Sequence, residues 1–172
     1  MTKGVASDYE HPVLALQSRH ALRFDDMKPL DLSKHPPRSP RVMLAGLLMM
    51  GRTVDKARAL LPGGNPGQYY VTPGISAWIL KRLGLSEAEF IDVVAAADDD
   101  AAVEAYIAPR VTDERRQKIN DFVSRFTILD VGDEMRALFE RHHPGFAEET
   151  TPIIELLERD DVRRFPTVRS ME

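Results

Sequence analysis

Arginines clustered around one aspartate are the side chains best suited to binding or transforming a ligand. Asp55 has Arg52 three residues before it and Arg58 three residues after it, which places all three on neighbouring positions of one predicted helix face. Two guanidiniums lower the pKa of a carboxyl between them, so Asp55 is better suited to orient a cation than to accept a proton. Arg38 and Arg41 come shortly before this helix, and a preorganised guanidinium pair suits a carboxylate, phenolate or phosphate.

Two tyrosines and one histidine complete the predicted catalytic set. Tyr69 and Tyr70 follow a glycine-rich loop, and a tyrosine hydroxyl beside a guanidinium can act as a general acid or donate to an oxyanion. The fragment 68–71 has a strand-like composition. Because neighbours in a strand face opposite ways, we expect at most one of these tyrosines in the site. His35, directly before Pro36, is the best-placed histidine for acid–base chemistry.

The run from residue 42 to residue 50 is apolar and rich in methionine. Its simplest role is in the core, but methionine-rich runs also line adaptable pockets for aromatic ligands. On that second interpretation Met49 contacts the ligand, while Arg38, Arg41 and Arg58 hold its anionic oxygen.

Each of these residues also has a purely structural explanation. The loop arginines could bind helix carbonyls and Asp31, and Asp55 could form an ordinary ion pair on a helix surface, which contributes little to stability. A tyrosine at the end of an element usually packs its ring and leaves its hydroxyl in water. His35 could be a plain exposed loop residue.

Several kinds of chemistry are excluded or left without a motif. The chain has no cysteine, which excludes disulfides, thiolate metal sites and a cysteine nucleophile. Glu140 and His143 have Glu-x-x-His spacing, but a di-metal bundle needs a second such helix, so we expect no metal. The sequence has no phosphate-binding glycine loop and no nucleophile elbow, and we therefore expect no cofactor.

The overall charge and hydropathy narrow the range of partners. The formal net charge of the 172 residues is −4, which argues against nucleic acid, and no apolar run approaches the ~20 residues of a membrane span. The segment Met1 to Glu10 lacks the apolar centre of a signal peptide, so we expect a cytoplasmic protein. A small-molecule ligand is the remaining expectation.

Charge is distributed unevenly along the chain. Residues 1–66 contain 10 basic and 6 acidic side chains, whereas residues 67–172 contain 13 basic and 21 acidic ones. The basic part could bind an anion, or the two parts could simply attract each other; the second interpretation is favoured because charge runs are mostly solvated faces.

The elements that must position these residues are helices. Four prolines between residues 28 and 41 predict an extended path, and Ser39 followed by Pro40 predicts a helix start. Further helices are predicted over 52–61, from Thr72-Pro73 to Leu83, and after four later caps, which are Ser86, Asp98–Asp100, Thr112 and Thr151-Pro152. A segment from Gly132 to His142 is also helical by its apolar spacing.

These segments predict a mainly α protein. We expect a compact single-domain bundle of roughly seven helices, with at most a minor two-stranded ribbon. The helical domain covers 30–160, between an N-terminal extension over 1–29 and a charged C-terminal tail over 161–172. The extension is too apolar for a disordered arm, so we expect it to pack on the body or to join subunits of a homo-oligomer.

Four motifs in fixed order resemble one protein family. They are Asp31-Leu-Ser-Lys-His-Pro-Pro-Arg-Ser-Pro-Arg41, Leu44 to Gly46, Asp55-Lys-Ala-Arg-Ala59 and Gln68-Tyr-Tyr70. This set is similar to a family of small bacterial proteins known mainly as a domain of unknown function. The resemblance covers about residues 30–126 and departs in the loop after Leu61. It implies a fold and a place to look for a site, and no reaction.

Two function classes follow from these observations. The first is a small cofactor-independent enzyme of lyase or isomerase type, acting by acid–base and arginine electrostatics on a phenolic, aromatic or carboxylate-bearing molecule. The second is a non-catalytic binding or interaction protein that uses the basic proline-rich loop as its contact surface.

Overall fold

The computed structural model describes residues 28–145 and 150–166, and within these ranges the protein is mainly α-helical. It has seven α-helices there and no strand, which confirms the predicted fold class. The helices are α2 (Met50–Ala59), α3 (Ile75–Arg82), α4 (Glu87–Ala96), α5 (Asp100–Ile107), α6 (Asp113–Arg125), α7 (Asp133–His142) and α8 (Ile153–Arg164). Nearly all of the predicted N-terminal extension lies outside the described residues.

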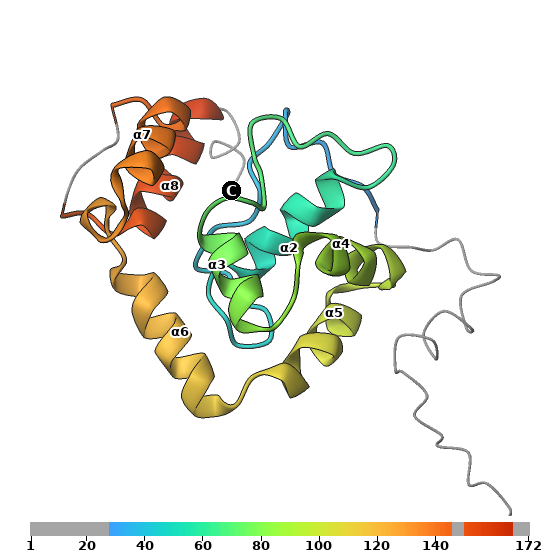
Figure 1. Ribbon diagram of the computed structural model, residues 1–172. Helices are drawn as coiled ribbons and strands as arrows, with labels where there is room; N and C mark the ends of the chain where they lie inside the picture. The colour runs from blue at the N-terminus through green and yellow to red at the C-terminus, as the bar shows by residue number, and fades with distance from the viewer. Residues whose placement is uncertain (1–27, 146–149, 167–172) are drawn as a thin grey trace, which may run out of the picture.

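Helix α2 occupies the centre of the molecule, and the other helices surround it (Figure 1). It packs against α4, and α6 packs against α8. Of its ten residues, eight are buried, and these include the charged Arg52 and Asp55. A central helix with buried charges must pair them with partners from the surrounding segments, because an unpaired buried charge is very costly.

Side-chain caps fix several helix starts where the sequence predicts them. Ser86 and Glu89 form a complete capping box at α4, Asp99 caps α5 through the Ala102 N–H, and Thr112 caps α6 through the Arg115 N–H. Each cap satisfies a backbone donor that the first helical turn leaves without a partner.

The segment before α2 differs from its prediction. Ser39 and Pro40 begin a turn rather than a helix, because the Val42 N–H binds the Ser39 carbonyl at 3.0 Å and the Met49 N–H binds the Pro40 carbonyl at 2.8 Å. Helix α2 therefore starts only at Met50. The interposed turn at Ala45 and Gly46 has φ values of 53° and 69°.

Asn120 of α6 holds that turn in place. Its side-chain amide donates to the Gly46 carbonyl at 2.8 Å, and its oxygen accepts from the Leu48 N–H at 2.9 Å. Glycine is favoured at position 46 by its positive φ of 69°, and a Cβ there would also make the flexible side chain of Arg116 shift.

Two other local predictions are corrected by the structure. The fragment 68–71 is irregular and not a strand, and it leads through a cis Thr72–Pro73 peptide bond to α3. The predicted tail from residue 161 also begins too early, because α8 continues to Arg164 and Asp161 is buried.

The hydrophobic core has two parts. The larger cluster joins α2 to α6 around Met50, Val54 and Phe90, and the smaller one contains Ile128, Phe139, Ile153 and Leu156. Ile75 and Leu157 pack against both clusters. Within the described residues, no helix is both long and apolar enough to cross a membrane.

Candidate functional site

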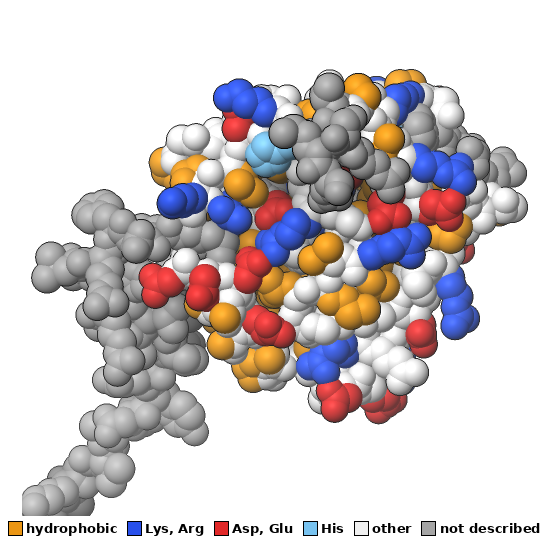
Figure 2. All heavy atoms as spheres, turned by 180° about the vertical axis from the view of Figure 1, so that it is seen from behind, with side chains coloured by type: hydrophobic (Ala, Val, Ile, Leu, Met, Phe, Trp, Pro, Cys, Tyr) orange, Lys and Arg blue, Asp and Glu red, His pale blue; other side chains and the backbone are white. Residues whose placement is uncertain are grey.

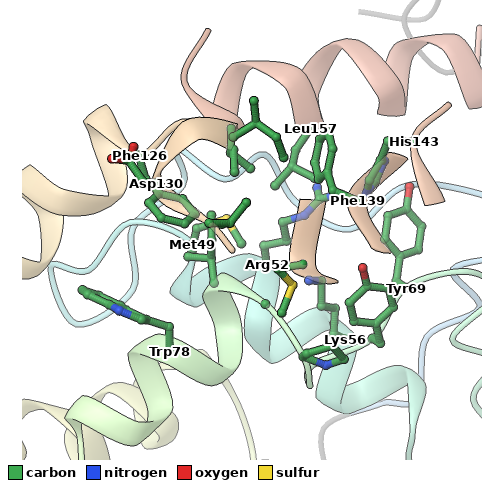
Figure 3. A pocket seen from close by; sticks show the side chains of 18 of the residues that line it. Met49, Arg52, Lys56, Tyr69, Trp78, Phe126, Asp130, Phe139, His143 and Leu157 are labelled. Atoms are coloured by element: carbon green, nitrogen blue, oxygen red, sulfur yellow. The ribbon is translucent and has the colours of Figure 1, made fainter. Parts of the chain in front are cut away.

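A cavity of about 350 Å³ lies between the two apolar clusters, with Ile75 and Leu157 in its wall. Its sides come from α2, the 68–74 segment, α3, α6, α7 and α8. Figure 3 shows Trp78, Phe126 and Met49 toward one end, and Arg52, Lys56, Tyr69 and His143 toward the other. The cavity thus has an aromatic, apolar end and a polar end.

Arg52 and Asp161 form the buried ion pair of the polar end. Two parallel hydrogen bonds of 2.6 and 3.0 Å join the guanidinium of α2 to the carboxylate of α8, and Arg52 also donates to the Arg38 carbonyl at 3.2 Å. The Arg52 side chain is only 1% exposed, so this charge depends on Asp161 for its neutralisation.

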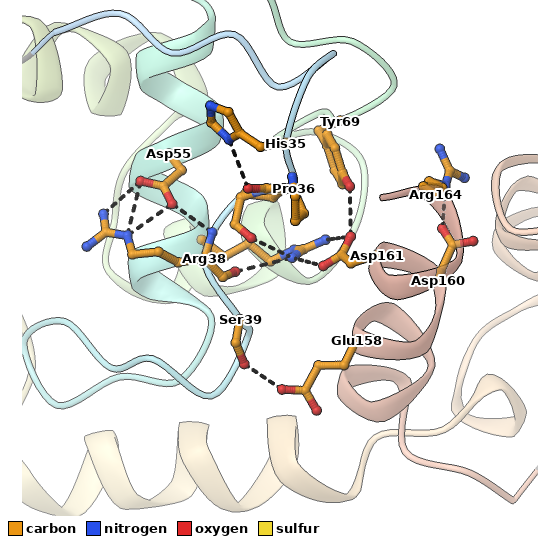
Figure 4. Close-up of polar contacts among 12 residues, drawn as sticks. His35, Pro36, Arg38, Ser39, Asp55, Tyr69, Glu158, Asp160, Asp161 and Arg164 are labelled. Carbon is orange, nitrogen blue, oxygen red and sulfur yellow. Dashed lines mark hydrogen bonds and ion pairs between the residues drawn. The ribbon is translucent and has the colours of Figure 1, made fainter. Parts of the chain in front are cut away.

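Tyr69 belongs to the same group. Its hydroxyl donates to Oδ1 of Asp161 at 2.7 Å, and its ring centroid lies 5.2 Å from Cζ of Arg52 (Figure 4). Burial, and next the negative charge of Asp161, raise the pKa of Tyr69 above its ordinary value. Tyr69 therefore stays protonated. Its one hydroxyl proton is already donated to Asp161, so Tyr69 positions that carboxylate.

Lys56 is a cation at the polar end without a carboxylate partner among the described residues. The one hydrogen bond of its Nζ in that part of the chain goes to Oγ of Ser76 at 3.4 Å, and the Tyr70 ring centroid lies 5.9 Å away. Burial and then the charge of Arg52 lower the pKa of Lys56 from 10.5 to about 7, against a smaller raising effect of Asp161. Burial and the neighbouring guanidinium therefore favour the neutral amine of Lys56 over its ammonium form.

His143 carries a carboxylate partner on one ring nitrogen. Its Nδ1 lies 2.5 Å from Oδ2 of Asp160, a carboxylate that is 1% exposed and also pairs with Nε of Arg164 at 2.6 Å. Burial lowers the pKa of His143 below its ordinary value, and Asp160 only partly offsets this. In the neutral ring the Asp160 contact places the proton on Nδ1 and leaves the Nε2 lone pair basic.

Tyr70 also lines the cavity, so both tyrosines contribute to one site. Within the described chain its hydroxyl has no hydrogen-bond partner, and its ring makes an edge contact with His142 at 5.0 Å between centroids. Burial raises the pKa of Tyr70, which keeps its hydroxyl a donor at neutral pH. The expectation that only one tyrosine reaches the site rested on a strand and is wrong for that reason.

Met49 reaches the cavity from a left-handed backbone conformation. Its φ is 66°, which is unfavourable for a residue with a side chain. The conformation is held by the hydrogen bond from the Met49 N–H to Pro40 and by two that its carbonyl accepts from Thr53, at 2.9 Å from N and 2.8 Å from Oγ1. Met49 is thus fixed in the wall of the cavity.

Arg38 and Asp55 meet as predicted, but they are not among the residues that line this cavity. Asp55 accepts from the Arg38 backbone at 2.8 Å and from its Nε and Nη2 (Figure 4). Nη1 of Arg38 binds Asp100 at the start of α5. Both carboxylates are thus occupied by one guanidinium. The group fastens the proline-rich loop to α2 and α5.

Arg41, Arg58 and His35 also bind elsewhere and are absent from the cavity lining. Arg41 donates to Glu158 of α8 at 2.9 Å, and Arg58 donates to the Lys28 carbonyl at 2.8 Å. Nδ1 of His35 lies 3.2 Å from the carbonyl of Pro36. The predicted site residues are therefore divided into two groups. Met49, Tyr69 and Tyr70 line the cavity, whereas the remaining ones lie on the proline-rich loop or on the part of α2 outside the cavity lining.

Arg52 and Lys56 lie in the cavity wall although the sequence analysis did not select them for a site. One signal could have found them, because residues 49, 52 and 56 recur at helical spacing and Asp55 lies about 100° away on another face. His143, Asp160, Asp161 and Arg164 come from distant segments, and no local spacing connects them with α2.

The basic and acidic parts of the sequence form ion pairs with each other within the molecule. Arg38, Arg41 and Arg52 of the basic part pair with Asp100, Glu158 and Asp161 of the acidic part. Figure 2 shows Lys or Arg and Asp or Glu side chains interspersed over one face of the molecule. Among the described residues, no three His, Asp or Glu side chains gather closely enough to hold a metal ion.

Comparison with known proteins identifies the domain over most of the chain. The family model for a domain of unknown function, DUF5069, matches residues 34–163. This match confirms the resemblance to a domain of unknown function and continues beyond residue 126 through α7 and most of α8. No curated protein matches the chain.

Proposed function

Because the chain belongs to the DUF5069 family, whose description names no activity, we propose a function from the cavity itself. The protein is a small enzyme that needs no cofactor and acts by lyase or isomerase chemistry on a small aromatic molecule bearing a carbonyl, phenolic or carboxylate oxygen. The observation that carries this proposal is that Lys56 and His143 lie at one end of a cavity whose other end is aromatic, with the Tyr70 ring centroid 5.9 Å from Nζ of Lys56.

The apolar end suits an aromatic ring. Trp78, Phe122 and Phe126 form a continuous series there, with ring centroids 4.2 and 4.8 Å apart. A cavity of about 350 Å³ is at the small end of ligand pockets and accommodates one ring with a short side chain. Burial of that ring supplies binding energy without charge pairing.

The polar end offers three different proton functions. His143, neutral and oriented by Asp160, is a base; Tyr70, protonated with a free hydroxyl in the described part of the chain, is a donor to an oxygen. Lys56 is an amine that changes charge near neutral pH. Removing a proton next to a carbonyl while stabilising the resulting oxygen charge needs this combination of base and donor.

The interaction-protein alternative is less well supported. It requires the loop arginines to face a partner, yet Arg38 is paired with Asp55 and Asp100, and Arg41 with Glu158. A surface whose guanidiniums are already neutralised attracts an acidic partner weakly.

The test combines binding with proton exchange. The full chain is titrated with phenols, aryl carboxylates and aryl ketones by calorimetry, and aryl ketones are then incubated with it in D₂O. We expect binding and enzyme-dependent deuteration next to the carbonyl, followed by NMR, with a loss of at least ~10-fold in His143→Asn. His35→Asn is the matched control, since His35 lies outside the cavity lining. Binding without exchange would favour the non-catalytic alternative, and exchange unaffected by His143→Asn would reject the proposed base.

A further inference from the structure

We propose that Lys56 is a covalent attachment site, at which its amine condenses with the carbonyl carbon of an aryl aldehyde or ketone to form an imine. This inference rests on the proposed function, since it uses the same cavity and names the carbonyl class of substrate. It adds a bond that acid–base catalysis by His143 and Tyr70 alone does not require.

The charge environment favours an amine over an ammonium ion. Lys56 is half-buried in the cavity wall, where a lysine ordinarily pairs with a carboxylate, but it has none within ion-pair distance in residues 28–145 and 150–166. The nearest charged side chain of its own helix face is Arg52, one turn before it, and Asp161 is already held by Arg52 and Tyr69. A lysine desolvated beside another cation is the known arrangement for an activated amine nucleophile.

The Lys56 amine has a single, long hydrogen bond to a hydroxyl. Thr53 Oγ1 donates to Oγ of Ser76 at 3.0 Å and also lies 2.8 Å from the Met49 carbonyl, and Nζ of Lys56 donates to the same Ser76 oxygen at 3.4 Å. With no carboxylate or carbonyl acceptor among the described residues, the amine is weakly held in the cavity wall, where a bound carbonyl carbon can reach it.

The covalent step balances without any further reagent. The Nζ lone pair forms a C–N bond to the carbonyl carbon, the π electrons move to the oxygen, and that oxygen takes a proton. Nitrogen loses one proton and the hydroxyl takes a second one from solvent, so loss of one water gives the protonated imine. Its C=N⁺ bond accepts the electron pair of a neighbouring C–H bond when a base such as His143 takes the proton. Return of a proton to carbon restores the imine, and water hydrolyses it to the amine and the carbonyl product.

Reductive trapping tests the proposal directly. The full chain is incubated at pH 7 with phenylacetone or benzaldehyde and sodium cyanoborohydride, and the modified lysines are mapped by peptide mass spectrometry. We expect Lys56 to be labelled at least ~10-fold faster than Lys118, an exposed lysine of α6 that pairs with Glu114, because burial and Arg52 lower the pKa of Lys56. The labelling rate of Lys56 should also titrate with a midpoint near pH 7.

Matched variants separate this inference from the proposed function. Lys56→Met should remove the label and Lys118→Met should leave it unchanged; labelling in the wild-type chain provides the answer if Lys56→Met does not fold. If lysines are labelled in proportion to their solvent exposure, and Lys56 reacts no faster than Lys118, the proposal of an imine at Lys56 is rejected. If Lys56→Met still catalyses deuterium exchange, the imine is rejected while the acid–base function stands. If aryl carbonyls neither bind nor label, both are rejected.

Discussion

Lys56 lies at the polar end of the cavity at a cost to the stability of the fold. Its amine is desolvated without a carboxylate partner in the described structure, and the neighbouring Arg52 adds repulsion. Its pKa of about 7 in the folded protein lies below the 10.5 of the unfolded chain. The folded state therefore binds fewer protons than the unfolded state between these two values, and protonation opposes folding.

Replacing Lys56 with Met is expected to stabilise the protein most at low pH. The wild-type penalty is fully present below pH 7 and disappears as the pH rises toward 10.5. The gain in free energy of unfolding should be at least about 1 kcal/mol at pH 6 and should shrink steadily by pH 9. Urea unfolding of both proteins at several pH values measures it, and a pH-independent difference would contradict the assignment.

Phenylalanine substitutions at the two tyrosines should affect different properties, turnover for Tyr70 and stability for Tyr69. Tyr70→Phe removes a hydroxyl without a protein partner in the described part of the chain, so turnover should fall at least ~10-fold with little change in stability. Tyr69→Phe removes a hydrogen bond to the buried Asp161 and should cost about 1.5–3 kcal/mol of stability. Paired activity and unfolding measurements decide this; equal effects of both substitutions on stability would argue against it.

Asp55 is expected to be structural. Asp55→Ala leaves the Arg38 guanidinium and backbone N–H without their main acceptor, and should cost about 3–5 kcal/mol in unfolding free energy. Arg58, whose Nη1 lies 3.9 Å from Asp55, is the matched control, and Arg58→Ala should cost less than about 1 kcal/mol. Thermal unfolding compares them. If the Asp55→Ala protein folds stably but no longer binds ligand, Asp55 belongs to the binding site and its role is not purely structural.

At the scale of elements, the attachment of α8 to α2 shapes the polar end of the cavity. Asp161 accepts from Arg52 and Tyr69, while Asp160, one residue before it, holds His143 and Arg164. Two adjacent aspartates of α8 therefore bind different elements: Asp161 binds α2, and Asp160 binds the end of α7. The position of His143 depends on this helix more than on its own.

Asp161→Ala is expected to damage both stability and the site. It strands the buried Arg52 charge, which should cost about 3–5 kcal/mol, and it should weaken ligand binding because α8 loses its attachment. The exposed pair between Arg159 and Glu155 on the same helix is the control, since Glu155→Ala should cost under about 1 kcal/mol. Calorimetry and unfolding curves test this, and a stable Asp161→Ala protein with unchanged binding would refute it.

At the scale of the whole molecule, the predicted N-terminal extension concerns residues outside the described part. Its apolar content predicts that it packs on the body or joins subunits. Deleting residues 1–27 should therefore lower the melting temperature or reduce the mass of an oligomer. Light scattering and thermal unfolding of both lengths measure this, and identical mass and melting temperature would show that the extension packs on nothing.

Fold class and most helix starts followed from the sequence alone. Caps such as Ser86 with Glu89, Asp99 and Thr112 act within one helical turn, so their spacing is sufficient to place α4, α5 and α6. The helix start predicted at Ser39 and Pro40 was wrong, because Asn120 of α6 and the hydrogen bond from the Met49 N–H to the Pro40 carbonyl stabilise turns where local signals favour a helix.

The candidate site was only partly contained in the sequence. The chain order placed Met49, Tyr69 and Tyr70 near α2, and an apolar run with tyrosines was enough to suggest an aromatic pocket. Tertiary structure alone decided which charges are buried together: Asp55 receives Arg38 on one face of α2, while Asp161 receives Arg52 on another and leaves Lys56 without a carboxylate in the described residues. A carboxylate's effect on an amine depends on distance and desolvation, and neither can be read from positions about a hundred residues apart in the chain.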